Sequence, residues 1–195
     1  MHHPLLIPLL FAFFITPTQM VQQMLRNTVV DLPLVELAGE TGDEPPAPVA
    51  LKYDRAKDEV TLTVAQTPSV MSKEGVTPWL RLFFLPPVAK DADPAEPLMA
   101  RLSKLGINTE KKVLSTTGPG GELILIIGKE RADEDAPHLA LYRSGMLPFR
   151  LSYGETTVTF GEYHKSVLPL AFPGTVEIRE PARTVRYRFL RNEYR

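Results

Sequence analysis

Short runs of alternating or continuous apolar residues predict β-strands along much of the chain. Residues 49–53 (VALKY) and 59–65 (EVTLTVA) are rich in β-branched side chains and flank the polar stretch DRAKD, a pattern that predicts a β-hairpin. Residues 121–128 (GELILIIG) form a continuous apolar run between glycines, as in a strand that is buried on both faces. Two further strands are expected at residues 79–86 and 147–154.

Two segments carry helix signals instead. Residues 94–106 place apolar side chains at helical spacing, with Gly106 in position to end the helix. Residues 132–145 begin with acidic side chains and have Arg143 near the end, which favours a second helix. The order of strands and helices therefore predicts a small two-layer α/β (α+β) domain over residues 49–154.

The C-terminal residues 155–195 predict additional strands, which we expect to form a β extension of this domain. In the last strand, Val185, Tyr187 and Phe189 fall on one face, while Arg186 and Arg188 fall on the other. The arginine row favours a solvated strand face. A contact with an acidic protein partner or with lipid headgroups is the alternative, and binding of nucleic acid is not expected.

The first 25 residues read as a membrane anchor or an export signal. No charged residue occurs from residue 2 to residue 25, and the most apolar run is residues 5–15. As a helix this run would rise roughly 16 Å, about half of a ~30 Å hydrocarbon core, so a membrane span would have to extend to Leu25 through several polar residues. Its length favours a signal peptide, although the basic start and the cleavage site of a signal peptide are missing. Residues 26–48 are expected to connect this segment to the domain, with a Pro/Gly-rich linker at 39–48.

Composition limits the possible chemistry. The 195 residues suffice for one domain with a core, and 22 basic against 23 acidic residues give no strong overall field. The chain has no cysteine, and its four histidines, at positions 2, 3, 138 and 164, have no recognisable catalytic or metal-ligating partners. We therefore predict no catalytic residue, metal or cofactor. An enzyme that uses His138 or His164 is the alternative.

The order of features resembles that of the ExbD/TolR family of energy-coupling membrane proteins. The segment VVDLP (29–33) is similar to a family motif, residues 45–64 occupy the place of its first two strands, and residues 122–154 look like its closing strand, helix and strand. The resemblance implies a single-pass inner-membrane protein with an extracytoplasmic domain. It also implies a non-enzymatic role in a biopolymer-transport complex, a multi-span ExbB/TolQ-like partner, a possible homodimer, and a partner contact at Asp31, Leu32 and Pro33.

The chain departs from this family in its membrane segment. No carboxylate precedes Asp31, whereas a proton relay in hydrocarbon needs an ionisable group. Under this resemblance, either the true start of the protein lies upstream, or this member has no proton relay of its own. The alternative is an exported periplasmic or surface binding module with a cleaved or uncleaved N-terminal signal, in which Arg186 and Arg188 belong to the binding surface.

Overall fold

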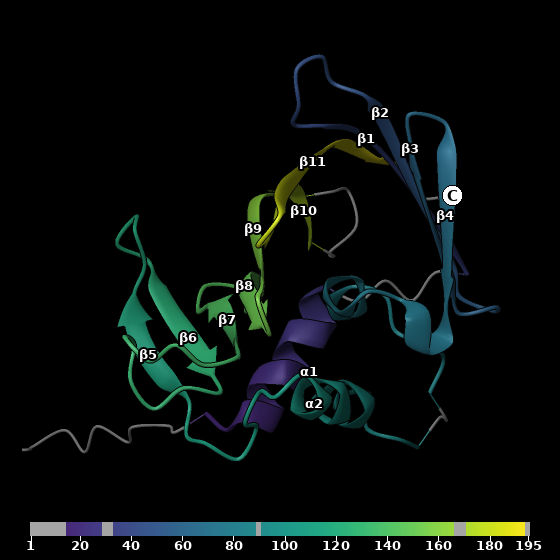
Figure 1. Ribbon diagram of the computed structural model, residues 1–195. Helices are drawn as coiled ribbons and strands as arrows, with labels where there is room; N and C mark the ends of the chain where they lie inside the picture. The colour runs from purple at the N-terminus through teal and green to yellow at the C-terminus, as the bar shows by residue number, and fades with distance from the viewer. Residues whose placement is uncertain (1–14, 29–32, 89–90, 166–170, 194–195) are drawn as a thin grey trace, which may run out of the picture.

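The computed structural model describes residues 15–28, 33–88, 91–165 and 171–193. Within them, eleven strands form one antiparallel sheet in the order β4-β3-β2-β1-β11-β10-β9-β8-β7-β6-β5. In Figure 1 the sheet curves from β4 through β11 to β5. The strands are β1 Leu34–Thr41, β2 Pro48–Asp54, β3 Glu59–Val64, β4 Thr67–Ser72, β5 Leu114–Thr117, β6 Leu123–Ile127, β7 His138–Tyr142, β8 Leu147–Tyr153, β9 Thr156–Lys165, β10 Ala171–Glu180 and β11 Arg183–Glu193.

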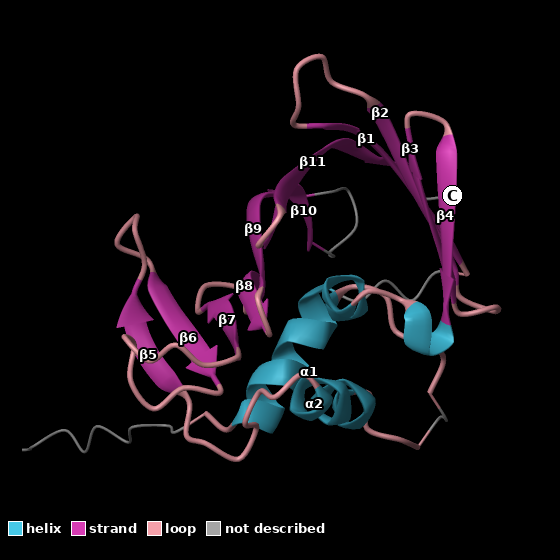
Figure 2. Cartoon of the chain, viewed as in Figure 1, coloured by secondary structure: helices cyan, strands magenta, loops and turns pink. Residues whose placement is uncertain are grey.

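Short helices lie on the inner side of the curve (Figure 2). They are α1 Pro17–Thr28, the 3₁₀ helices η1 Lys73–Gly75 and η2 Pro78–Leu82, and α2 Ala95–Lys104. Helix α1 packs against α2 and against strands β8 and β10. The main hydrophobic core therefore lies between the inner face of the sheet and these helices.

Helix α1 is capped and amphipathic. At its start, the Gln19 amide donates to Thr16 Oγ1 at 3.2 Å, and the Thr16 amide donates to Gln19 Oε1 at 2.9 Å, the reciprocal pair of a capping box. Met20 and Met24 are fully buried, four residues apart on one face. The folded domain thus already includes residue 16.

The predicted single-pass membrane helix over residues 1–25 is wrong. Residues 17–25 belong to α1, and their apolar side chains pack into the protein core instead of facing lipid. None of the helices in the described ranges is long and apolar enough to cross a membrane. Residues 1–14 lie outside the described residues.

The predicted two-layer α/β fold is also wrong. Residues 132–145 contain a turn and then strand β7, because Pro137 cannot donate a helical hydrogen bond and the strand that follows it pairs with β6 on one side and β8 on the other. Residues 79–86 are not a strand: η2 and the chain after it fill the core, with Phe83 fully buried. A continuous apolar run fits either a strand or a buried helical turn.

Other expectations are confirmed. The hairpin is β2 paired with β3, the helix over 94–106 is α2, and 121–128 contains the buried strand β6. The segment 39–48, however, is the end of β1, a hairpin loop and the start of β2. Strand β1 pairs with β11, so the sheet continues from the N-terminal to the C-terminal part of the chain without a break at residue 154.

A buried arginine ties the edge of the sheet to the core. The Arg81 side chain in η2 is 1% exposed and forms an ion pair with Asp58, including a 2.9 Å bond from Nη2 to Oδ2. Asp58 lies in the turn between β2 and β3, with a left-handed φ of 51°. Arg81 also donates to the main-chain carbonyls of Lys73, after β4, and Phe84. One side chain therefore connects β2, β3 and β4 to the segment below them.

Replacing Asp58 with Asn tests this tie. The Asp58→Asn change keeps a residue that tolerates a left-handed backbone but leaves the buried Arg81 charge without a counterion. We expect the free energy of unfolding in urea to fall by roughly 3–5 kcal/mol. Asp54 in the same hairpin pairs with exposed Lys57, so Asp54→Asn should cost far less. Equal losses in both variants would contradict the role given to Arg81.

Candidate functional site

The inner side of the sheet contains an apolar groove at the end that the helices do not cover. It has a volume of about 400 Å³. One wall comes from β3 and β4, and the other comes from β10 and β11, which the curvature of the sheet brings opposite. The groove is lined by Leu62, Val64, Thr67, Ser69, Met71, Thr77, Trp79, Tyr153, Ile178, Glu180, Arg183, Val185 and Tyr187.

The apolar side chains of the groove are only half-buried. Leu62, Met71, Ile178 and Val185 keep part of their surface in contact with solvent, while Trp79 below them is 3% exposed. Trp79 packs against the core through Phe160, with ring centroids 6.4 Å apart. The groove therefore has a fixed aromatic side chain on its core side and an incompletely covered apolar lining.

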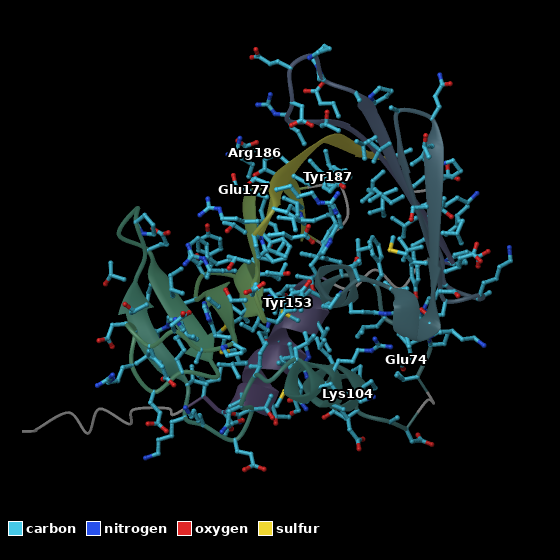
Figure 3. All side chains as sticks on the ribbon, viewed as in Figure 1. Glu74, Lys104, Tyr153, Glu177, Arg186 and Tyr187 are labelled. Carbon is cyan, nitrogen blue, oxygen red and sulfur yellow. The ribbon has the colours of Figure 1, made fainter. Side chains whose placement is uncertain are left out.

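A few polar groups accompany this lining. Arg183 Nε donates to Glu180 Oε2 at 2.9 Å, so the two charges compensate each other. The hydroxyl groups of Tyr153 and Tyr187 (Figure 3) have no hydrogen-bond partner within the described part of the chain. Burial raises the pKa of both phenols, and Glu180 adds to the rise, so both remain neutral donors at neutral pH. The polar part of the groove is thus uncharged overall.

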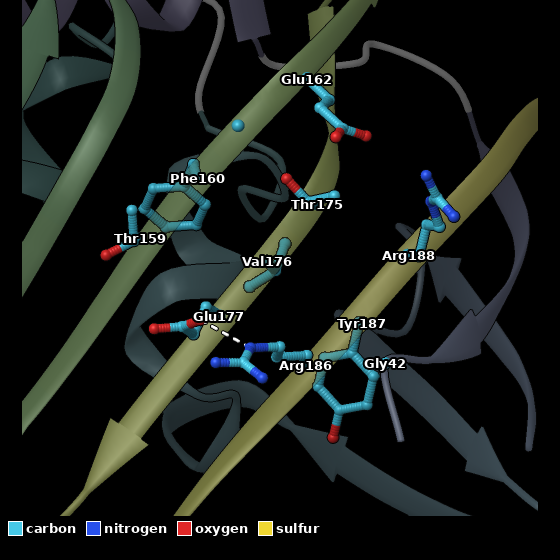
Figure 4. A pocket seen from close by; sticks show the side chains of 11 residues that line it. Gly42, Thr159, Phe160, Glu162, Thr175, Val176, Glu177, Arg186, Tyr187 and Arg188 are labelled. Atoms are coloured by element: carbon cyan, nitrogen blue, oxygen red, sulfur yellow. Dashed lines mark hydrogen bonds and ion pairs between the residues drawn. The ribbon is translucent and has the colours of Figure 1, made fainter. Parts of the chain in front are cut away.

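A second depression lies on the outer face of β9, β10 and β11 (Figure 4) and contains the predicted residues Arg186 and Arg188. Both arginines are exposed, on the opposite face of β11 from Val185 and Tyr187, as the alternation predicts. Arg186 Nε donates to Glu177 Oε2 at 2.7 Å. Glu177 also accepts from Arg179 at 2.9 Å, so one carboxylate is shared between two arginines. The role of Arg186 and Arg188 in partner binding stays a prediction.

The other predicted contact residues lie elsewhere or outside the described residues. Asp31 and Leu32 belong to the undescribed stretch 29–32. Pro33 is exposed just before β1, whereas Arg188 pairs with Glu40 near the far end of the same strand. The structure therefore does not bring Pro33 together with the two arginines.

His138 has a structural environment. It is 7% exposed in β7, and its Nδ1 donates to the Ala136 carbonyl at 2.9 Å. Burial lowers the pKa of His138, and the positive charges of Lys129 and Arg150 lower it further. His2 and His3 lie outside the described residues, as does the side chain of His164. Within the described ranges, no three acidic, histidine or cysteine side chains gather to hold a metal ion.

Most of the groove was not recognised from the sequence. The alternation of Val185 and Tyr187 indicated one inward face of β11. The opposite wall could have been suggested by the same period of two in Leu62 and Val64, but no local signal shows that these strands face each other. The sequence pattern predicts a strand at Trp79 and gives no sign of the place of this residue in the groove.

Comparisons with known proteins give one structural likeness. No protein-family model and no curated protein matches the sequence. Among solved structures, the chain is similar to the crystal structure of the LolA superfamily protein NE2245 from Nitrosomonas europaea. The two share 9% sequence identity with a TM-score of 0.47, and the alignment covers 93% of this chain and 94% of that chain.

The resemblance to the ExbD/TolR family is wrong. Residues 122–154, which suggested a strand, helix and strand, form the three antiparallel strands β6, β7 and β8. The inner-membrane location, the role in an energy-coupling complex and the ExbB/TolQ-like partner were inferred from that resemblance and from a membrane helix, so they are wrong as well.

The buried environment of His138 predicts a pH-dependent stability. The folded state disfavours the charged imidazole of His138. The contribution of the neutral imidazole to the stability of the fold is therefore complete above the unfolded pKa of 6.5, and it is lost as the pH falls from there through the lower folded pKa. Between about pH 7 and about pH 5, the wild-type chain should lose more unfolding free energy in urea than the His138→Gln variant. Equal losses would show that His138 does not cause this dependence.

Proposed function

We propose that the protein is an exported, non-enzymatic binding protein. Its ligand is an amphiphile, with an apolar chain in the groove and an uncharged polar head at its polar groups. The observation that carries this proposal is the half-buried apolar lining between two walls of one curved sheet. Covering such a surface gains about 25 cal/mol per Å² of apolar area removed from water.

The size and composition of the groove support a small ligand. Its volume of about 400 Å³ lies within the ~300–1,000 Å³ of typical ligand cavities. Such cavities are mainly apolar and contain a few polar groups that orient the ligand. Here Tyr153 and Tyr187 offer neutral donors, and the Glu180–Arg183 pair adds no net charge, which favours a hydroxyl or amide head over an ion.

The N-terminal sequence supports export. The folded domain includes the cap formed by Thr16 and Gln19, and Ile15 packs against the core. Ile15 and Met20 occupy the two positions of a hydrophobic staple around this cap. The apolar run 5–15 has the length of a signal-peptide core.

Ligand binding can be measured with the single tryptophan of the chain, Trp79, which lines the groove. Bromododecanol, an uncharged chain with a heavy-atom quencher, should quench Trp79 emission in a saturable manner. The Ser69→Phe variant places a ring in the groove from β4. Because the ring takes up space that the ligand would occupy, the affinity should fall roughly five- to a hundredfold, which corresponds to about 1–3 kcal/mol of binding free energy.

The neighbouring residue provides the matched control. Val70 is 60% exposed and does not line the groove, so Val70→Phe should bind bromododecanol as the wild type does. Both variants should keep the wild-type unfolding midpoint. Saturable quenching that neither variant changes would refute the groove as the binding site, and an absence of quenching in the wild type would refute the proposed ligand class.

Export is tested on the native protein. Mass and N-terminal sequencing should find a chain that lacks most of residues 5–15 and begins before Pro17, because α1 belongs to the core. A native chain that retains the whole apolar run would rule out a cleaved signal.

A further inference from the structure

A second cavity lies between α2 and the segment that contains η1 and η2. It has a volume of about 300 Å³ and is lined by apolar side chains and by polar groups from both sides. The apolar part comes from Val76, Pro78, Leu98, Leu102 and Leu105. Figure 3 labels one residue on each side, Glu74 on η1 and Lys104 on α2. The cavity is distinct from the apolar groove, although Thr77 lines both.

Two polar atoms at this cavity are buried without a partner. Arg81 lines the cavity and is 1% exposed, and its Nη atoms donate to Asp58 and to main-chain carbonyls. Its Nε, by contrast, has no hydrogen-bond partner, and the same holds for Thr77 Oγ1. Both atoms are themselves out of contact with solvent, so a ligand in the cavity would reach them only after neighbouring side chains move.

The charges around the cavity favour an anion. The Asp58 carboxylate compensates Arg81, and Glu74 lies 3.4 Å from Arg101 Nη2. Lys104 has no ion-pair partner in the part of the chain that the structure describes. The cavity therefore carries about one uncompensated positive charge beside an apolar lining.

We propose that this cavity binds a small organic carboxylate with an apolar body. The body lies against half-buried Leu105 and the apolar lining beside it, and the carboxylate lies toward Lys104. A volume of 300 Å³, at the lower end of the range for ligand cavities, suits a medium-length chain such as that of octanoate. Unlike the apolar groove, this second cavity selects for charge.

Calorimetric titration with octanoate, octanol and octylamine tests the proposal. Octanoate should bind the full chain about tenfold or more tightly than octanol, because hydrogen bonds to a charged group are among the stronger ones. Octylamine should bind least well, since its charge repels Lys104. The Leu105→Trp change fills the cavity from half-buried Leu105 and should weaken octanoate about tenfold. Lys104→Gln removes an exposed charge and should weaken it about threefold.

Two controls separate this site from the groove. Exposed Lys112 does not line the cavity, so Lys112→Gln should bind octanoate normally. Ser69→Phe should also bind octanoate normally while it loses bromododecanol, and Leu105→Trp should show the reverse. The affinities are compared only among variants that keep the wild-type unfolding midpoint.

Three results would overturn the proposal. They are octanoate binding that neither Leu105→Trp nor Lys104→Gln weakens, octanoate binding that Ser69→Phe abolishes, and equal affinity for octanoate and octanol. A failure of bromododecanol to quench Trp79 would concern only the groove, because octanoate binding is measured without that fluorescence.

Discussion

The structure depends on the buried ion pair between Arg81 and Asp58. A guanidinium that is 1% exposed is tolerated in a core only when a counterion and further acceptors surround it, because removal of a charge from water costs several kcal/mol. Asp58 supplies the counterion from the turn between β2 and β3, and the carbonyls of Lys73 and Phe84 accept from the same side chain. The ion pair therefore fixes where three sheet strands meet the segment beneath them.

This tie has a direct consequence for the apolar groove. Strands β3 and β4 form one of its walls, at the edge of the sheet, and they connect to the opposite wall only through β2 and β1. Such a connection through two intervening strands can twist and bend. Arg81 holds the lower ends of β3 and β4, while Trp79, two residues before it, packs against Phe160 in β9. The separation of the two walls is thus set by η2 as well as by the sheet.

Several elements could be predicted from the sequence because their signals are local. The hairpin of β2 and β3 follows from two β-branched runs around a polar turn, and α2 follows from apolar spacing that ends at Gly106. The failures have a shared cause. Acidic residues before Pro137 resemble a helix start, yet the residues after it form β7, which pairs with the neighbouring strands β6 and β8. Residues 17–25 resemble the end of a membrane span, yet they belong to α1, which packs against α2, β8 and β10 far along the chain. In both segments, contacts with other elements of the fold outweighed the local sequence pattern.

For a related reason, the local sequence pattern could not predict the groove. Its two walls are more than a hundred residues apart in the sequence, and they face each other because β1 pairs with β11 and closes the curve. At Gly39 the register shifts, and an added Cβ would collide with the Arg188 carbonyl, so the two strands approach closely only because this residue is glycine. The half-buried state of Val185 cannot be read from alternation, which gives the inward face but not how well that face is covered. Whether an inward face becomes core or binding surface depends on what the opposite wall and the helices leave open.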